Sequence, residues 1–407
     1  MIRDEIEVEC GNSRTPAEKC SASMRNYLSA ATFVVIVIVA SMMLAFTSCH
    51  AHANDLPGIA DGASPMDSVV KAEVSTHGLR LLYWGNDDDI ADEDLAEALS
   101  ICESSMEFVR TTLGIELPFR VTVNWIPRSL AFSAGTVLPS TINIYSGSFK
   151  EFGIRLFVHE LVHLFAQHLG APDHRTRYIE EMFADGIASA YRPDDRLTMR
   201  SHSQSWLIFE VDREQRSTPL LEMMIGGPRS IGHTPLSVLF HANSGGAFIA
   251  EKYGTSNLAE LYKALPSQRE MTAQSWAKIS GIVSEAILSC LNVTVDELEK
   301  DWRTYLDGIS GKRNLAAYVE PYSAYYVHIH EPLIASGRLN GLLQAGLVDA
   351  NVLAEIKGLY YELENLISDA IEPSRNIIDD YKAKVLRVAG IVANAIPSPM
   401  DHRNERP

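Results

Sequence analysis

The spacing of apolar residues differs between an early part of the chain and the remainder. Residues 120–125 and 141–145 alternate apolar and polar side chains, and residues 79–84 form a short apolar run, so we expect three strands there. Elsewhere apolar residues recur every three or four positions, as in amphipathic helices. Segments with this helical spacing are 92–113, 204–211, 235–253, 258–265, 276–290, 295–306, 352–367 and 377–392. The pattern predicts an α+β fold with a small mixed sheet followed by a mainly helical remainder.

A different pattern precedes the first expected strand. Residues 27–46 are apolar and uncharged, and about 20 such residues suffice to cross a bilayer. Basic residues precede this run, which predicts a cytoplasmic amino terminus. Ala51-His-Ala53 fits a small-x-small cleavage site for signal peptidase. We therefore predict a cytoplasmic segment at 1–26, a signal sequence or transmembrane anchor at 27–53, and an extracytoplasmic body, periplasmic or at the cell surface.

The net charge of the chain indicates which classes of binding partner it disfavours. The chain has 52 acidic and 35 basic side chains and a formal net charge of −17. Such an acidic body does not suit nucleic acid or an anionic membrane surface. Of the five cysteines, only Cys102 and Cys290 lie in the part expected to be exported, and two cysteines do not decide whether they pair.

One helical segment carries candidate chemistry. Within an otherwise apolar run, residues 159–163 read His159-Glu160-Leu-Val-His163. Side chains four residues apart lie on one helical face, so both imidazoles can close on a single metal ion. The carboxylate beside them can take a proton from water and pass it to a leaving amine. The opposite side of the helix, which we expect to be buried, is formed by Phe157, Leu161, Leu164 and Phe165. The pattern predicts a Zn²⁺ site with Glu160 as general base; the alternative is two ordinary core histidines.

A second helical segment supplies the third ligand. It covers residues 178–191, and Pro193 is expected to end it. Glu181 and Asp185 are four residues apart, so one can bind the metal while the other accepts the second ring N–H of a ligand histidine. Glu180 points about 100° away from Glu181 on a helix. We therefore assign the metal to His159, His163 and Glu181, with Asp185 orienting an imidazole.

These two motifs in this order resemble the gluzincin metallopeptidases, the clan of thermolysin and alanyl aminopeptidase. The sequence H-E-L-V-H followed by E-M-F-A-D is similar to their metal-binding helices, and the chain is closest to the bacterial peptidase MA-like family. Residues 245–254 and 291–302 are similar to that family's later helices, so the resemblance extends over roughly residues 80 to 308. It implies a zincin-like lobe that contains the His-Glu-x-x-His helix, a helical lobe, bound zinc, and a peptide or protein substrate. By resemblance, residues 141–145 would be the strand at the edge of the cleft that pairs with an extended peptide.

The sequence departs from the family pattern at two points. The segment 140–147 lacks the Gly-x-Met-Glu-Asn strand that captures a substrate amino terminus in the aminopeptidases, which favours an endopeptidase. No motif fixes the residue that stabilises the oxyanion. Our first choice for that role is His241, and His233, Tyr145 and Tyr178 are the alternatives.

The expected protein is an exported or membrane-tethered zinc metallopeptidase. The alternative is a non-catalytic cell-surface binding or scaffold protein that retains a peptidase-like fold. After the two N-terminal segments, the expected divisions are a linker rich in small residues at 54–75, a zincin-like catalytic lobe at 76–193, a helical lobe that closes the cleft at 194–311, and a helical C-terminal extension at 312–407.

Overall fold

The computed structural model describes residues 72–75, 78–85, 90–126, 134–138, 140–145, 149, 153–169, 176–193, 196–225, 235–335, 338–368 and 373–395. The chain separates into two compact units, Met1–Gly62 and Ala63–Pro407, and all described residues belong to the second. The expected N-terminal segments 1–26 and 27–53 lie outside the described residues. The linker expected at 54–75 is wrong at its end, because residues 72–75 form a strand.

The sheet has five strands in the order β1-β2-β3-β5-β4. The central strands β2, β3 and β5 are parallel, and β1 and β4 pair antiparallel with β2 and β5. Alternation places Val121 and Val123 of β3 and Ile142 and Ile144 of β5 in the core, all fully buried. The bounds are Ala72–Ser75 for β1, Leu79–Tyr83 for β2, Val121–Ile126 for β3, Ala134–Leu138 for β4 and Thr141–Tyr145 for β5. The chain is therefore α+β with a small mixed sheet, as predicted.

The predicted edge strand is not at the edge of the sheet. Residues 141–145 were expected at the sheet edge, but they form β5, which lies between β3 and β4. The edge position belongs to β4, which no sequence pattern indicated. Within the described part of the chain, β4 pairs with β5 alone.

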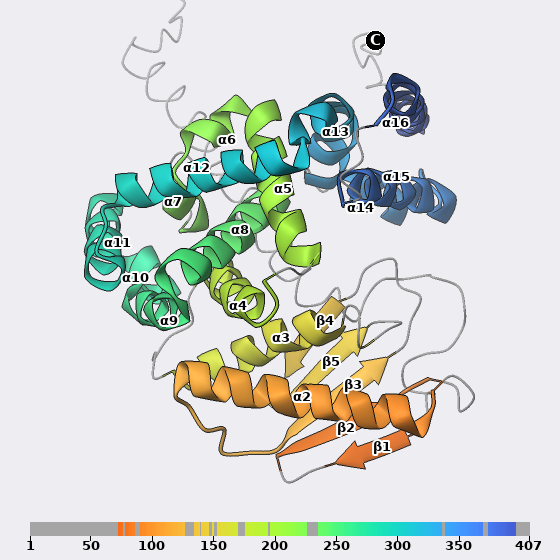
Figure 1. Ribbon diagram of the computed structural model, residues 1–407. Coiled ribbons are helices and arrows are strands. Elements are labelled where there is room, and N and C mark those ends of the chain that lie inside the picture. Colours follow the sequence, from red (N-terminus) through yellow and green to blue (C-terminus); the bar gives the residue numbers. More distant parts are fainter. Residues whose placement is uncertain are drawn as a thin grey trace, which may run out of the picture. The chain divides into compact units, whose positions relative to one another are not determined.

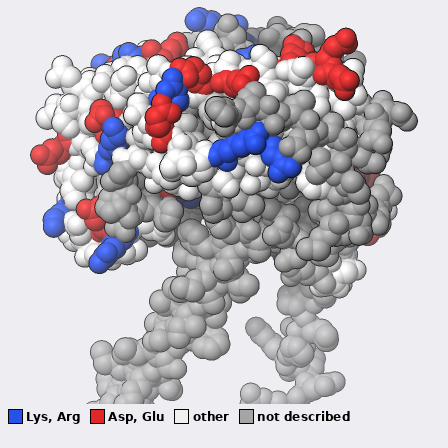
Figure 2. All heavy atoms as spheres, turned by 90° about the horizontal axis from the view of Figure 1, so that it is seen from below, with Lys and Arg blue, Asp and Glu red and all other residues white. Residues whose placement is uncertain are grey.

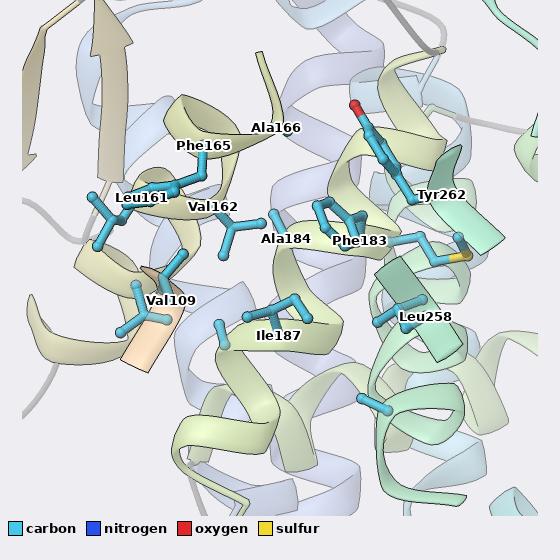
Figure 3. Packing of buried hydrophobic residues seen from close by; sticks show 14 of the residues in the cluster. Val109, Leu161, Val162, Phe165, Ala166, Phe183, Ala184, Ile187, Leu258 and Tyr262 are labelled. Atoms are coloured by element: carbon cyan, nitrogen blue, oxygen red, sulfur yellow. The ribbon is translucent and has the colours of Figure 1, made fainter. Parts of the chain in front are cut away.

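Two helices pack on this sheet and on each other (Figure 1). Helix α2, Asp92–Leu113, connects β2 to β3, and Gly114 ends it in the left-handed conformation with φ of 65°. Helix α3, Ile154–Ala166, packs against α2, β4 and β5. Figure 3 shows Leu161, Val162 and Phe165 of α3 in this buried core near Val109 of α2.

The helical remainder begins with α4, Arg177–Tyr191, which ends two residues before Pro193 as expected. Helix α8 matches the predicted segment 235–253 at both ends, and α11 and α12 start where expected. The bounds are Arg196–Val211 for α5, Arg213–Ser217 for α6, Leu220–Met224 for α7, Pro235–Tyr253 for α8, Thr255–Ala264 for α9, Gln268–Ala273 for α10, Trp276–Leu291 for α11 and Val295–Arg313 for α12.

Helices α4 and α8 approach so closely that two glycines are required. A Cβ atom on Gly246 of α8 would lie 1.9 Å from the carbonyl oxygen of Met182 on α4. A Cβ atom on Gly186 of α4 would lie 2.7 Å from the carbonyl oxygen of Gly246. Both distances are far below van der Waals contact with backbone atoms that cannot move aside. The two glycines let the backbones of α4 and α8 come into direct contact. This contact positions α4, with the carboxylates that it carries, against the helical remainder.

The C-terminal helices build a second hydrophobic cluster, which we call the C-terminal core. It contains residues of α13, of the π-helix η6 and of α14 to α16, together with Leu207 and Ile208 of α5 and Phe240 of α8. The predicted helices at 352–367 and 377–392 correspond to α15 and α16. The bounds are Leu315–Tyr318 for the 3₁₀-helix η5, Val319–Tyr325 for α13, Tyr326–Ala335 for η6, Arg338–Gln344 for α14, Ala350–Ser368 for α15 and Arg375–Ala395 for α16.

Two observations bear on membranes and disulfides. Among the described residues no helix taken alone has the length and hydropathy of a membrane span; α11 and α12 reach that threshold only as a pair, which is bent by 67°. Cys102 and Cys290 are both free, and Cys102 is buried.

Candidate metal centre

Helix α3 presents its two motif histidines on the side away from the core. His159 and His163 are partly buried, whereas Phe157, Leu161, Leu164 and Phe165 are at most 1% exposed, as predicted. The helix is thus held by its apolar side, and the histidine side is left available for chemistry.

Helix α4 places Glu181 opposite the two imidazoles. His159 Nε2 lies 3.1 Å from His163 Nε2 and 3.3 Å from Glu181 Oε2. The three donor atoms all lie within 4.8 Å of one another, so this group could hold one metal ion. Tetrahedral ligands about 2.0–2.1 Å from a zinc ion are separated by roughly 3.3 Å. The donor types and the two measured separations fit such a site, which we call the candidate metal centre.

Asp185 holds the other nitrogen of His159. Its Oδ1 lies 2.7 Å from His159 Nδ1, and the Asp185 side chain is only 3% exposed. A carboxylate here favours the tautomer with the proton on Nδ1, which leaves the Nε2 lone pair for a metal. Asp185 and Glu181 therefore hold the two places relative to His159 that the spacing of four predicted.

The electrostatics of the two histidines differ. Burial, together with His159 nearby, lowers the pKa of His163 to about 4, so its ring is neutral at pH 7 as a ligand must be. Burial alone would lower the pKa of His159, but Asp185 and Glu181 outweigh it and raise that pKa well above its ordinary value. The two carboxylates therefore favour a positive charge at His159, which is the charge that a cation would supply.

Glu160 lies beside these ligands on the same helix. Its side chain is buried, and burial raises the pKa of the carboxyl to about 7, with Glu181 and Asp185 also raising it and His159 opposing them. A group with a pKa near the working pH can both accept and return a proton. A cation in the candidate metal centre would lower this pKa through its charge.

The structure puts His241 in a different environment. The residue is fully buried in α8, its ring stacks on Phe209 at 4.4 Å between centroids, and its Nε2 lies 3.2 Å from Gln215 Oε1. These contacts tie His241 to α5 and α6 rather than to the candidate metal centre.

The structure says less about the three alternatives to His241. His233 and the side chain of Tyr145 lie outside the described residues. Tyr178 is partly buried on α4, where it packs against the main hydrophobic core. The residue that stabilises the oxyanion therefore stays a prediction.

Sequence reasoning missed Arg155. This arginine is 6% exposed on α3, and its Nη2 lies 3.0 Å from Asp185 Oδ1. Its Nε donates to Thr198 Oγ1 of α5 at 3.2 Å. A signal was present, because residues 155, 159 and 163 share a spacing of four, which puts the arginine on the histidine side of the helix.

We compared the chain with protein-family models and with curated proteins, and neither comparison finds a match.

Proposed function

We propose that the protein is a zinc-dependent metallopeptidase of the gluzincin type, which hydrolyses peptide bonds within a peptide or protein substrate. The observation that carries the proposal is the convergence of His159, His163 and Glu181 from two helices on one point, with Glu160 beside them. Core histidines also need hydrogen-bond partners, so the proposal rests on the three donor atoms from two helices that lie within 4.8 Å of one another.

Each residue has a distinct role in this proposal. His159, His163 and Glu181 hold the metal, and Asp185 orients the His159 ring through Nδ1. A zinc ion bound there would supply Lewis acidity toward a peptide carbonyl and toward water. Glu160 is placed to accept a proton from the attacking water and to return it to the leaving nitrogen.

The surrounding helices suit a two-lobed zincin. In the division that we propose, residues 76–193 form the zincin-like lobe with the sheet, α3 and α4, and residues 194–311 form the helical lobe. The close packing of α8 on α4 supports a fixed relation between the ligand helix and that second lobe.

Substrate would be recognised mainly through its backbone. Strand β4 packs against α3, and no other described strand pairs with its outer edge, so its main-chain groups there would bind an extended peptide by strand addition. The segment before α3 contains no glutamate positioned as in aminopeptidases, which supports endopeptidase activity. Export or tethering through residues 27–53 is part of the proposal and follows from the sequence alone.

Metal analysis is the first test. The wild-type chain should bind about one zinc ion, as expected for a site with three protein ligands and one open position. Glu181→Ala should lose the ion, and Glu180→Ala is the matched control that should keep it. Loss of the ion in the control with retention in Glu181→Ala would reverse the ligand assignment. Absence of bound metal in the wild type would end the proposal.

Proteolysis is the second test. Glu160→Gln should bind zinc as the wild type does and should cleave an unstructured protein about 10²–10⁴-fold more slowly, which is the contribution of a positioned general base. A wild-type chain that binds zinc but cleaves no unstructured protein would instead favour the binding or scaffold alternative.

A further inference from the structure

Arg155 is a buried charge in an apolar helix, and a buried arginine is found almost only where it is paired. It precedes His159 by four residues, so it lies one turn away on the same side of α3. The proposed chemistry does not use it directly. Its contacts indicate what it does.

The guanidinium joins three helices behind the candidate metal centre. Its Nη2 lies 3.0 Å from Asp185 Oδ1 on α4, and this same oxygen lies 2.7 Å from His159 Nδ1 on α3. Its Nε donates to Thr198 Oγ1 on α5. A continuous chain of contacts therefore runs from α5 through Arg155 and Asp185 to the ring of His159.

We propose that Arg155 is a positioning residue of the metal centre, which fixes the Asp185 carboxylate so that Oδ1 receives Nδ1–H of His159 and Nε2 faces the ion. This inference rests on the proposed zinc site and names a further residue that the site requires.

Two features of Asp185 make the arginine necessary. Oδ1 takes contacts from both Arg155 and His159, whereas Oδ2 is buried and accepts no hydrogen bond from the described residues. Without the guanidinium, the carboxylate could turn about its Cβ–Cγ bond and release His159. It would also be a buried charge that has lost its permanently charged partner, a situation that proteins avoid by rearrangement or protonation.

Zinc affinity measured by competition with a chelator tests the proposal without any activity assay. Arg155→Met should weaken zinc binding about 10–100-fold, the loss typical when a partner of a ligand histidine is removed. Arg155→Lys should recover part of that loss, because it restores the charge but not the planar geometry. Thr198→Val is the matched control: it removes the contact to α5 and leaves the one to Asp185, so it should change affinity less than threefold.

A double-mutant cycle separates positioning from general damage to the fold. If Arg155 acts through Asp185, then Arg155→Met should cost little further affinity in an Asp185→Asn background. The absorption spectrum of the cobalt-substituted protein should change in Arg155→Met and in Asp185→Asn but not in Thr198→Val. Should Arg155→Met fail to fold, the double variant, which has no unpaired buried charge, and Arg155→Lys still carry the test.

The inference and the proposed function fail in different ways. If the wild type and Arg155→Met bind zinc with equal affinity and give the same cobalt spectrum, Arg155 is a structural residue and the peptidase proposal stands. Additive losses in the double-mutant cycle would also overturn the positioning role. If the wild type binds no zinc, the proposed function itself is overturned.

Discussion

The candidate metal centre and the C-terminal core both bury charged groups, but they differ in how those groups are completed. In the C-terminal core a half-buried cation and a buried carboxylate balance each other's charge within the protein, and we call this pair closed: Arg200 Nε of α5 lies 3.3 Å from Glu364 Oε1 of α15, and Arg200 Nη1 donates to Glu364 Oε2 at 3.4 Å. At the candidate metal centre, a series of contacts runs from Arg155 through Asp185 to His159. The Nε2 atom of His159 lies only 3.1 Å from His163 Nε2. Two nitrogen lone pairs that face each other at this distance repel, unless a cation or a proton lies between them. We call this group open because a cation can complete it, and it is here that we propose that a metal ion binds.

The same contrast holds for packing. Around the candidate metal centre, α4 and α8 meet at their backbones through Gly186 and Gly246. On the outer sides of α15 and α16, by contrast, Gly358 is exposed and Gly390 is half-buried, and added Cβ atoms on them would meet nothing within 4 Å. Large aromatic side chains fill the interior of the C-terminal core. Helix α5 belongs to both regions, because Thr198 contacts Arg155 while Leu207 and Ile208 pack in the C-terminal core.

The largest effect is expected for Gly246→Ala. A methyl group there would overlap the Met182 carbonyl oxygen, so α4 and α8 must separate, at a cost of about 3 kcal/mol or more in the free energy of unfolding. Denaturant unfolding measures it. The control is Gly358→Ala on α15, which has open space and should gain about 0.5–1 kcal/mol from helix propensity. Equal effects at the two glycines would contradict the difference in packing.

The next effect concerns the closed pair. Arg200→Met leaves the Glu364 carboxylate buried with no cation in contact, and we expect a loss of about 2–3 kcal/mol. This is below the value for a fully buried pair, because the Arg200 side chain is 31% exposed. Adding Glu364→Gln should recover a good part of the loss, and unfolding of the two variants measures it. If the double variant is less stable than the single one, the residues act independently of their pairing.

Zinc should distinguish the open group from the closed pair. A ligand that binds only the folded state stabilises it by about 2.7 kcal/mol at 100 times its Kd. Zinc should therefore raise the melting temperature of the wild type and a chelator should reverse the rise. Glu364→Gln should keep this response and Glu181→Ala should lose it. A rise of equal size in Glu181→Ala would mean that zinc binds elsewhere.

The sequence predicted local features well and non-local ones poorly. The helix that carries His159 and the bounds 235–253 followed from spacing, because helical periodicity is a local property. The rotation per residue allows only one of Glu180 and Glu181 to face the ion, and Glu181 was chosen because Asp185 follows it by four residues. That β4 rather than β5 forms the edge could not be predicted, because strand order depends on pairing between distant segments.

Contacts between residues on different helices could not be predicted either. His241 was our first choice for the oxyanion role, but its partner Gln215 and its stacking partner Phe209 come from other helices. The π-helix η6 contains Pro332, and no helical spacing was apparent there. Arg155 could have been noticed from its spacing of four, although its partner Asp185 becomes evident only once α3 and α4 are side by side.

The smallest effect is a dependence of stability on pH that arises in the C-terminal core. His330 lies in η6 against the rings of Tyr325 and Tyr326, and its Nδ1 is buried without a hydrogen bond from the described residues. Burial lowers its pKa to about 4. In the unfolded chain a histidine has a pKa of about 6.5, so between these values the unfolded state binds a proton that the folded state does not. Stability should therefore fall as the pH decreases from about 6.5 and level off near 4.

His330→Leu isolates this contribution, since leucine matches an apolar site and leaves no polar atom to satisfy. The wild type should lose about 1 kcal/mol more than the variant between pH 6.5 and 5.5, as measured by denaturant unfolding at the two pH values. The full slope of about 1.4 kcal/mol per pH unit is approached only well below the unfolded pKa. Part of the decline should persist in the variant, because burial also lowers the pKa of His202 on α5, to about 3, with the charge of Arg155 adding to the effect. Identical pH profiles for wild type and His330→Leu would show that the His330 ring is protonated in the folded state as readily as in the unfolded one, so that burial beside Tyr325 and Tyr326 would not exclude the charge.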